Sequence, residues 1–289
     1  MQFLSKRLVK KNIIIGGKQE MKKYLIMLGN LLLYIGTYFL IIKSLVFVGR
    51  NYVLPQPGIG PWLNKNSLVV TVTSDLIQFT IFYFMFKKLK GKSLFEHVKL
   101  TKKISAGNLA IISIIGISAG FFTSAVFKLP YITEKYPDLV AIMKFMFVDG
   151  GNVVVFTCFL LVGSVFKEIL FRGLIFNEFR NAFPLALAVL LQGLMYGILF
   201  FSFSPPLMVY GFIGAVLFTI LYVLVDSLWA PIIAQATCQG SMYILMITGD
   251  VFVNKNTVIP LIVISMIIIV AGTVYMTKKT RKELNSISV

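Results

Sequence analysis

Lys167, Glu168 and Arg172 are the residues of this chain whose types and spacing best suit chemistry. They follow a long apolar run, and charged groups at membrane depth are costly enough to imply a functional or structural role. Glu168 and Arg172 are four residues apart, so they share one helix face and can pair. The carboxylate could act as a general base, or the pair could only stabilise a turn. We expect this segment, 163–173, at the end of a membrane helix near the cytoplasmic face.

Other polar residues in apolar surroundings are further candidates. Asp75 lies in the apolar run 68–86 and could belong to a relay or ligand site, although we expect a structural role near the solvated outer end. Gln235 and Gln239 are four residues apart and share a helix face. The single histidine, His97, lies in a basic loop, where we expect it to be solvated.

The composition predicts the fold class. The 289 residues are 57% hydrophobic and 13% charged, whereas a soluble domain carries about 25% charged residues. Apolar runs near the length that crosses a bilayer recur along the chain. We therefore predict an all-α, polytopic integral membrane protein with eight transmembrane helices, over 24–48, 68–86, 109–127, 153–166, 185–203, 208–225, 228–247 and 258–276. Cys158 and Cys238 both fall inside these helices, which argues against a disulfide framework.

The positive charge predicts the orientation in the membrane. Of the 28 Lys and Arg residues, 21 lie in the N-terminal arm, the segments 87–107 and 167–182, and the C-terminal tail. Cytoplasmic loops carry such an excess, so both termini are predicted to be cytoplasmic. The net charge of +17 lies in loops between apolar helices. It therefore suits anionic lipid headgroups rather than nucleic acid.

The chain divides into four parts by charge and hydropathy. These are a basic cytoplasmic arm (1–23), N-terminal transmembrane helices (24–150), a core (151–250), and a last transmembrane helix with a basic cytoplasmic tail (251–289). Segment 138–148 is too short to span and is expected at the interface or as a re-entrant turn. Gly116 and Gly120 form a Gly-x-x-x-Gly pattern, which predicts close packing between helices.

Three stretches resemble the CPBP family, the CAAX-prenyl-protease-2-like (Abi) intramembrane proteases. The family's first motif reads Glu-Glu-x-x-x-Arg, and here Lys167 precedes Glu168 and Arg172. Segment 196–200, Tyr-Gly-Ile-Leu-Phe, is similar to a Phe-Gly-x-x-His element and places Phe200 at the histidine position. Segment 227–234, Ser-Leu-Trp-Ala-Pro-Ile-Ile-Ala, resembles the lead into His-x-x-x-Asn, where this chain has Gln235 and Gln239. The resemblance spans 155–250 and implies a CAAX-protease-2-like helical core.

The same resemblance implies that the catalytic set is lost. In the family, a Glu and two His activate water while an Asn holds the oxyanion, and these positions hold Lys167, Phe200, Gln235 and Gln239 here. Glutamine cannot titrate and is a poor zinc ligand, and phenylalanine offers neither property. We therefore expect no catalytic residue, no metal and no cofactor. Glu168 and Arg172 match the family's second Glu and Arg, which look like a supporting structural pair.

Three functions remain open. The first is a catalytically inactive membrane scaffold that binds a membrane protein or peptide, because proteins of this resemblance include bacteriocin self-immunity factors and partners of cell-envelope enzymes. The second is an active CAAX-type intramembrane endopeptidase whose divergent site uses Glu168. The third is a transporter or lipid-handling protein, suggested by Asp75 and segment 138–148. The Lys-, Ile- and Phe-rich composition suits the cell membrane of a Gram-positive, low-GC bacterium.

The orientation can be tested with fusions. A fluorescent protein that matures only in the cytoplasm should be bright when fused after Val289, because the tail is predicted to lie inside. The same reporter inserted in the loop 51–66 should stay dark and serves as the opposite control. A dark fusion after Val289, expressed at the same level, would reverse the predicted orientation.

Overall fold

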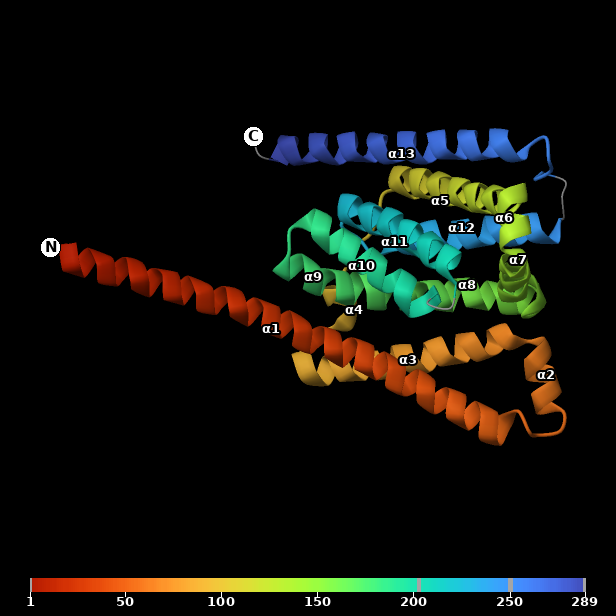
Figure 1. Ribbon diagram of the computed structural model, residues 1–289, viewed down its shortest axis with the longest axis horizontal. Coiled ribbons are helices and arrows are strands. Elements are labelled where there is room, and N and C mark those ends of the chain that lie inside the picture. Colours follow the sequence, from red (N-terminus) through yellow and green to blue (C-terminus); the bar gives the residue numbers. More distant parts are fainter. Residues whose placement is uncertain (1, 202–203, 249–251, 288–289) are drawn as a thin grey trace.

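The chain forms a bundle of helices, described for residues 2–201, 204–248 and 252–287 in a computed structural model (Figure 1). Within these residues every regular element is helical, as the composition predicts. The long helices are α1 (Gln2–Val48), α3 (Ser67–Lys90), α5 (Ala106–Phe127), α8 (Val153–Glu168), α10 (Leu185–Phe201), α11 (Pro205–Val225), α12 (Trp229–Ile247) and α13 (Val258–Ile287). They run lengthwise, and the short helices α2 (Ile59–Lys65), α4 (Leu94–His97), α6 (Pro130–Lys135), α7 (Pro137–Lys144) and α9 (Phe176–Ala182) lie toward the two ends.

Seven helices among the described residues are long and apolar enough to cross a membrane, which makes this a multi-pass membrane protein by helix length and hydropathy. They are Glu20–Val53, Ser67–Lys90, Ala106–Phe127, Val153–Ala182, Pro205–Val225, Trp229–Ile247 and Val258–Glu283. The eighth predicted span, 185–203, corresponds to α10, which is apolar and has 17 described residues, about 25 Å at 1.5 Å per residue against a hydrocarbon core of roughly 30 Å. The last two residues of that predicted span, 202 and 203, lie outside the described residues.

The charged segment lies in the middle of a helix, and the expectation that it ends one is wrong. α8 continues through a π-helical stretch, η3 (Ile169–Ile175), into α9. Together they form one apolar helix of 30 residues, Val153–Ala182, and Lys167 is near its centre. The helix passes through its charged residues without stopping because their partners lie inside the bundle, as described below.

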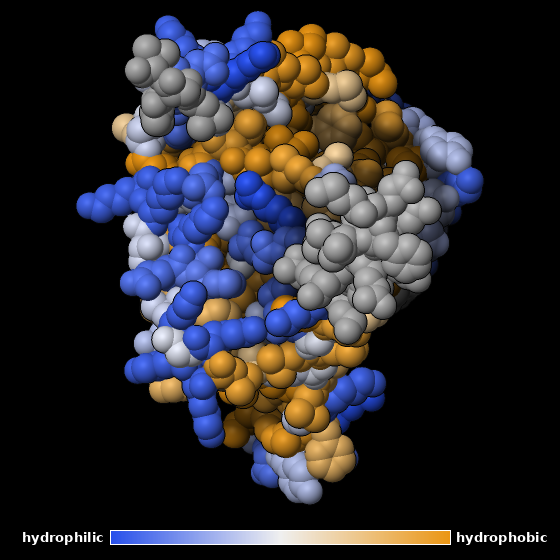
Figure 2. Space-filling model, turned by 90° about the vertical axis from the view of Figure 1, so that its left-hand side faces the viewer, coloured by the Kyte–Doolittle hydropathy of each residue, from blue (hydrophilic) through white to orange (hydrophobic). Residues whose placement is uncertain are grey.

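Hydrophilic residues gather at one end of the bundle. The ends of the chain on α1 and α13 lie at this end in Figure 1, together with α4 and α9. Figure 2 looks directly onto this end and shows many hydrophilic side chains there. The arrangement agrees with basic segments that share one side of the membrane. The assignment of that side to the cytoplasm stays a prediction.

Segment 138–148 does not cross the bundle, as its length predicts. α6, α7 and the π-helical η2 (Phe145–Asp149) are short and lie at the end opposite the termini. Pro137 begins α7, where its missing N–H costs nothing. Leu139, Met143 and Phe147 are buried, so this segment closes the bundle on that side.

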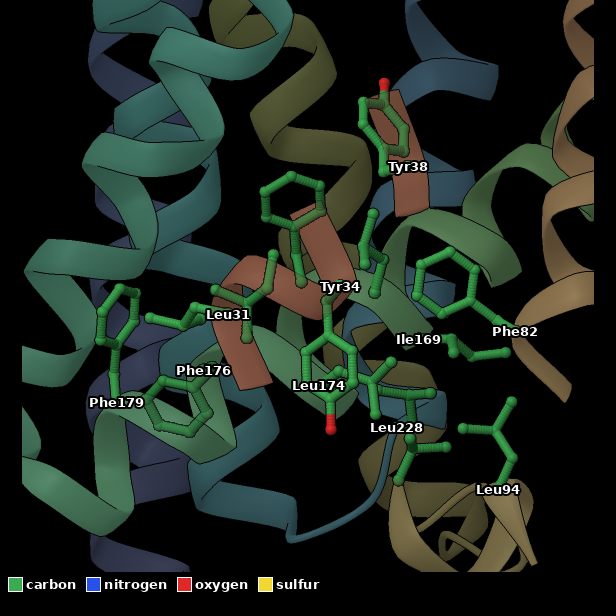
Figure 3. Close-up of a cluster of buried hydrophobic side chains, with 14 of the residues drawn as sticks. Leu31, Tyr34, Tyr38, Phe82, Leu94, Ile169, Leu174, Phe176, Phe179 and Leu228 are labelled. Atoms are coloured by element: carbon green, nitrogen blue, oxygen red, sulfur yellow. The ribbon is translucent and has the colours of Figure 1, made fainter. Parts of the chain in front are cut away.

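The largest apolar core surrounds η3 and α9. Figure 3 shows Ile169, Leu174, Phe176 and Phe179 of η3 and α9 within this core. The side chains that pack around them come from α1, α3, α4 and the turn before α12, and those labelled are Leu31, Tyr34, Tyr38, Phe82, Leu94 and Leu228. Polar contacts tie the same helices together. Asn30 Nδ2 donates to Glu178 Oε1 at 2.9 Å, and Lys90 Nζ donates to Asn30 Oδ1 at 2.9 Å. These contacts hold the 30-residue helix in the bundle.

Gly116 and Gly120 pack α5 directly against α12, which confirms the packing interpretation of the Gly-x-x-x-Gly pattern. A Cβ on Gly116 would lie 2.5 Å from the carbonyl oxygen of Ala234, and one on Gly120 would lie 2.5 Å from that of Cys238. Both carbonyls belong to the helix that carries Gln235 and Gln239. The glycines therefore let the two backbones approach, and they fix the position of α12.

Adding one methyl group tests this interface. Gly120→Ala should destabilise the protein by about 1–3 kcal/mol, because a backbone carbonyl that cannot rotate away stands where the Cβ must go. Gly29→Ala is the matched control, since nothing lies within 4 Å of a Cβ there. In a helix it should be neutral or stabilise by up to about 1 kcal/mol. Unfolding titrations in mixed detergent micelles would compare the two, and equal midpoints would contradict close α5–α12 packing.

Candidate functional site

A cavity of about 110 Å³ lies between α7, α8, α10, α11 and α12. Lys167, Phe200, Gln235 and Gln239 all line it. Three helices supply these four residues, from positions up to 72 apart in the chain. The tertiary fold thus brings together the four positions at which the sequence departs from the CPBP pattern.

Glu168 and Arg172 form a buried ion pair beside the cavity. Arg172 Nη1 donates to Glu168 Oε1 at 2.7 Å, and the two side chains are 1% and 0% exposed. We expected this pair at the end of a helix, whereas the helix continues for ten residues beyond Arg172. Its position relative to the lipid–water interface stays a prediction. A pair so deep is stable only when its remaining hydrogen-bonding groups are satisfied.

α11 and α10 satisfy the guanidinium group of Arg172, whereas Glu168 Oε2 is buried without a hydrogen-bond partner. Arg172 Nη2 donates to the Ala215 carbonyl at 3.1 Å, and Nε donates to Thr219 Oγ1 at 3.3 Å. Thr219 Oγ1 donates in turn to Gln192 Oε1 at 2.7 Å. Thr219 and Gln192 are polar residues of this network that were not predicted from the sequence. Their signal was available, since Gln192 is the only amide of α10 and Thr219 the only Ser or Thr of α11.

The π-helical turn holds the charged pair at a close approach between the helix and a loop. π-turns within α-helices occur frequently at functional sites, and here the turn contains Arg172 and Gly173. A Cβ on Gly173 would lie 2.5 Å from Val98 Cγ1. Gly173 therefore allows the 87–107 loop to rest on the helix beside the ion pair.

The Ser-Leu-Trp stretch at 227–229 anchors the same loop. Ser227 Oγ donates to the Lys102 carbonyl at 2.5 Å, and Trp229 Nε1 donates to the Leu100 carbonyl at 2.8 Å. Asp226, at the preceding turn, pairs with Lys99 and, at 2.6 Å, with Lys102. Burial alone would raise the pKa of Asp226, but hydrogen bonds from Lys102 and Lys99 lower it overall. This stretch is therefore structural: it fixes the beginning of α12.

The side chain of Lys167 lines the cavity and is not paired with a carboxylate. Its Nζ lies 4.9 Å from the ring centroid of Phe159 and 5.6 Å from that of Phe200, within the range of cation–π contacts. No ion pair within 4.0 Å joins Lys167 to a carboxylate among the residues that the structure describes. Phe200 thus contributes an aromatic face for the ammonium group at the position where the resemblance places histidine.

Gln235 and Gln239 face the cavity with unused hydrogen-bonding capacity. Gln235 is 2% exposed, and neither its Oε1 nor its Nε2 has a protein partner. Gln239 Oε1 is also buried without a partner. A buried amide left unpaired costs free energy, so these groups indicate that the cavity receives a polar guest or water. Cys238, which lies between them on α12, lines the same cavity.

Asp75 is buried, and the expectation of a solvated place near the outer end is wrong. The residue is 6% exposed, and its Oδ2 has no hydrogen-bond partner. A Cβ on Gly163 would lie 3.0 Å from this oxygen, so α3 and α8 pack closely there. Asp75 does not line the cavity itself.

His97 lies apart from the cavity, in the basic loop as predicted. It ends α4, and its ring centroid is 4.7 Å from that of Phe86. Desolvation by its surroundings, followed by the charges of Lys90 and Lys92, lowers the pKa of His97. The histidine does not line the cavity.

The residues present do not fit a zinc ion. A catalytic zinc needs three protein ligands, normally from His, Cys, Asp or Glu. No group of three such residues lies together in the described part of the chain. The cavity lining offers one thiol, two amides, two phenols and two cations, and Cys238 is the only one of the usual zinc ligands among them. We derive no chemistry through a metal here.

A double-mutant cycle tests whether Glu168 and Arg172 act as one structural unit. Glu168→Ala and Arg172→Ala should each destabilise the protein by about 3–5 kcal/mol, because each leaves a buried charge uncompensated. The double change should cost less than the sum, with a coupling energy of up to about 3 kcal/mol. Lys102→Ala, at a pair in which Lys102 is 52% exposed, is the control and should cost at most about 1 kcal/mol. Additive effects at 168 and 172, measured by unfolding in detergent, would refute the pair.

Comparison with known proteins gives one match. Residues 149–241, about a third of the chain, match the family described as Rce1-like, type II CAAX prenyl endopeptidase. No curated protein and no solved structure matches the chain. The matched region contains the Lys167–Arg172 segment, the Tyr196–Phe200 segment and the α12 glutamines, so it includes most of the cavity lining. Over residues 149–241 the chain is therefore similar to the Rce1-like, type II CAAX prenyl endopeptidase family.

Proposed function

We propose that this protein is a non-hydrolysing Rce1-like scaffold, which holds a segment of another membrane protein or a membrane peptide in its cavity. The observation that supports this most is the cavity lining, which includes neither a carboxylate nor an imidazole among the described residues. Peptide hydrolysis needs a general base or a metal-bound hydroxide to activate water. Neither is available at the positions where the resemblance implies it.

Glu168, the carboxylate that matches the first motif, does not line the cavity. Glu168 is absent from the cavity lining and is bound to Arg172. Glu168 is linked to Thr219 and Ala215 only through Arg172, which donates hydrogen bonds to both. A base that cannot touch water in the cavity cannot activate it for attack. We therefore assign Glu168 a structural role.

The cavity retains features that suit a polypeptide guest. Gln235 presents a free donor and a free acceptor side by side, which matches the N–H and C=O of a peptide group. Aromatic residues Tyr196, Phe200 and Phe218 form much of the remaining wall. Regulation of a cell-envelope enzyme or self-immunity to a bacteriocin would follow from such binding. We place both termini in the cytoplasm and anionic lipid around the basic end.

An active endopeptidase is the second candidate, and one observation favours it. Glu168 Oε2 is buried with no hydrogen-bond partner, so this oxygen would be free to accept a proton if the cavity widened. The two candidates differ in what substitution at 167 and 168 should do.

Lys167→Glu restores the first-motif carboxylate and should create no peptidase activity, because Phe200, Gln235 and Gln239 still supply neither base nor metal ligand. Cleavage of a fluorogenic prenylated CAAX peptide by the purified full chain would be measured for wild type, Lys167→Glu and Glu168→Gln. Elemental analysis of the same samples should find no stoichiometric zinc. Activity in Lys167→Glu, or activity that Glu168→Gln abolishes at unchanged folded yield, would establish the endopeptidase instead.

Partner binding is tested by photo-crosslinking from the cavity. Benzoylphenylalanine in place of Phe200, which lines the cavity, should give an adduct with one membrane protein or peptide in the native cell. The matched control is Phe84, which is 62% exposed on α3. The adduct should weaken with Gln235→Leu, because the polar guest loses its amide partner. The same adducts at both positions, unaffected by Gln235→Leu, would count against the scaffold.

A further inference from the structure

A second, larger hollow opens beside the cavity. It has a volume of about 720 Å³ and lies along α11, with walls from α5 and α13 and one end at α6 and α7. We call it the lateral groove. Its wall is almost entirely apolar, with Phe122, Val126, Leu217 and Ile269 among the lining residues. Val209 and Ile213, at 58% and 56% exposed, lie on its rim, where a membrane helix faces lipid.

The groove and the cavity share one wall. Tyr210, Gly214, Phe218 and Cys238 line both. Gly214 leaves a gap in this wall, because a Cβ there would meet no atom within 4 Å. An apolar chain in the groove can therefore place its end beside the cavity without displacing the backbone.

The cavity end of this path carries positive charge. Lys167 and Arg172 line the cavity and no described carboxylate does. Arg172 is paired with Glu168, whereas the Lys167 ammonium group lies against the rings of Phe159 and Phe200 and makes no ion pair within 4.0 Å among the described residues. The carboxylates of Asp75 and Glu168 act on it only at longer range. Gln235, 2% exposed, has a free donor at Nε2 in the same space. A cation without an ion-pair partner and an amide donor without a hydrogen-bond partner are stabilised by an anionic guest.

We propose that the groove and cavity together bind a single-chain lipid carboxylate, a long-chain fatty acid drawn from the bilayer. Its alkyl chain lies in the lateral groove, and its carboxylate accepts hydrogen bonds from Lys167 Nζ and Gln235 Nε2. The α11 residues that line the groove run from 205 to 220, about 22 Å at 1.5 Å per residue, so an extended alkyl chain can lie along it.

This inference goes beyond the proposed scaffold function, because the lipid site needs no protein partner. It also gives a use to the Lys at the first-motif position, which neither hydrolysis nor the Glu168–Arg172 pair requires. A fatty acid at Lys167 would occupy the same cavity as a polypeptide guest, so the two ligands would compete.

Photolabelling of the purified full chain in neutral detergent tests the site. Palmitic acid with a diazirine at its methyl end should label residues of the lateral groove on α5, α11 and α13, saturably, and unlabelled oleate should compete. Hexadecanol, which has the same chain and no charge, should compete at least about tenfold more weakly, the loss expected for one charge-assisted hydrogen bond. Lys167→Met should lower the affinity for palmitate about tenfold and leave that for hexadecanol unchanged.

Two glycine variants separate the groove from general effects on the bundle. Gly214→Phe fills the gap between groove and cavity and should abolish competition by oleate. Gly36→Phe, at an α1 position where nothing lies within 4 Å of a Cβ, should leave it unchanged. If Gly214→Phe fails to fold, the comparison of palmitate with hexadecanol on wild type still decides the proposal.

Equal competition by acid and alcohol, or labelling that does not saturate, would overturn the fatty-acid site. Labelling outside the groove that Lys167→Met does not change would overturn it as well. Saturable palmitate binding, with no protein crosslinked at position 200, would support the lipid site and contradict the proposed protein partner. A Phe200 adduct without palmitate binding would do the reverse.

Discussion

The ion pair between Glu168 and Arg172 is the interaction on which the rest of this structure depends. Four elements meet at it: the pair itself spans α8 and η3, Arg172 bonds to α11, and Thr219 extends the network to α10. Water cannot stabilise the charges of two side chains that are 0% and 1% exposed, so each is held by protein groups alone. This requirement positions the helices that form the cavity.

The residues that resemble the family pattern and those that depart from it differ in what they do. Glu168, Arg172, Ser227 and Trp229 all match the pattern, and each makes hydrogen bonds that fix helices or the 87–107 loop. Lys167, Phe200, Gln235 and Gln239 depart from it, and all four line the cavity. In this structure, the residues that match the pattern position the helices, and the residues that depart from it form the cavity wall.

Close backbone packing gives the cavity its shape. Gly116 and Gly120 bring α5 against α12, and Gly197 lets α10 approach α11, since a Cβ there would lie 2.6 Å from the Met208 carbonyl. Without a hydrophobic effect between helices in lipid, such contacts hold a membrane bundle together. They also leave little freedom for Gln235 and Gln239, whose helix is fixed at its start by Trp229.

Much of this protein was determined by the sequence alone. Hydropathy and run length predict an all-helical, multi-pass membrane protein, because a lipid-exposed backbone must satisfy its own hydrogen bonds. Spacing of four residues predicts the Glu168–Arg172 pair, and small residues at the same spacing predict that α5 packs closely against another helix. The resemblance in three stretches identifies the four substituted positions, and the structure brings these into one cavity.

Only the tertiary structure decided depth and partners. Sequence patterns do not show where a charge finds its counter-groups, so Arg172 was expected at an interface, although Ala215 and Thr219 stabilise it in mid-helix. For the same reason Asp75 was expected near solvent, although α8 covers it at Gly163. The junction between the groove and the cavity at Gly214 depends on how separate helices meet. These features arise from contacts between residues far apart in the chain, which no local periodicity records.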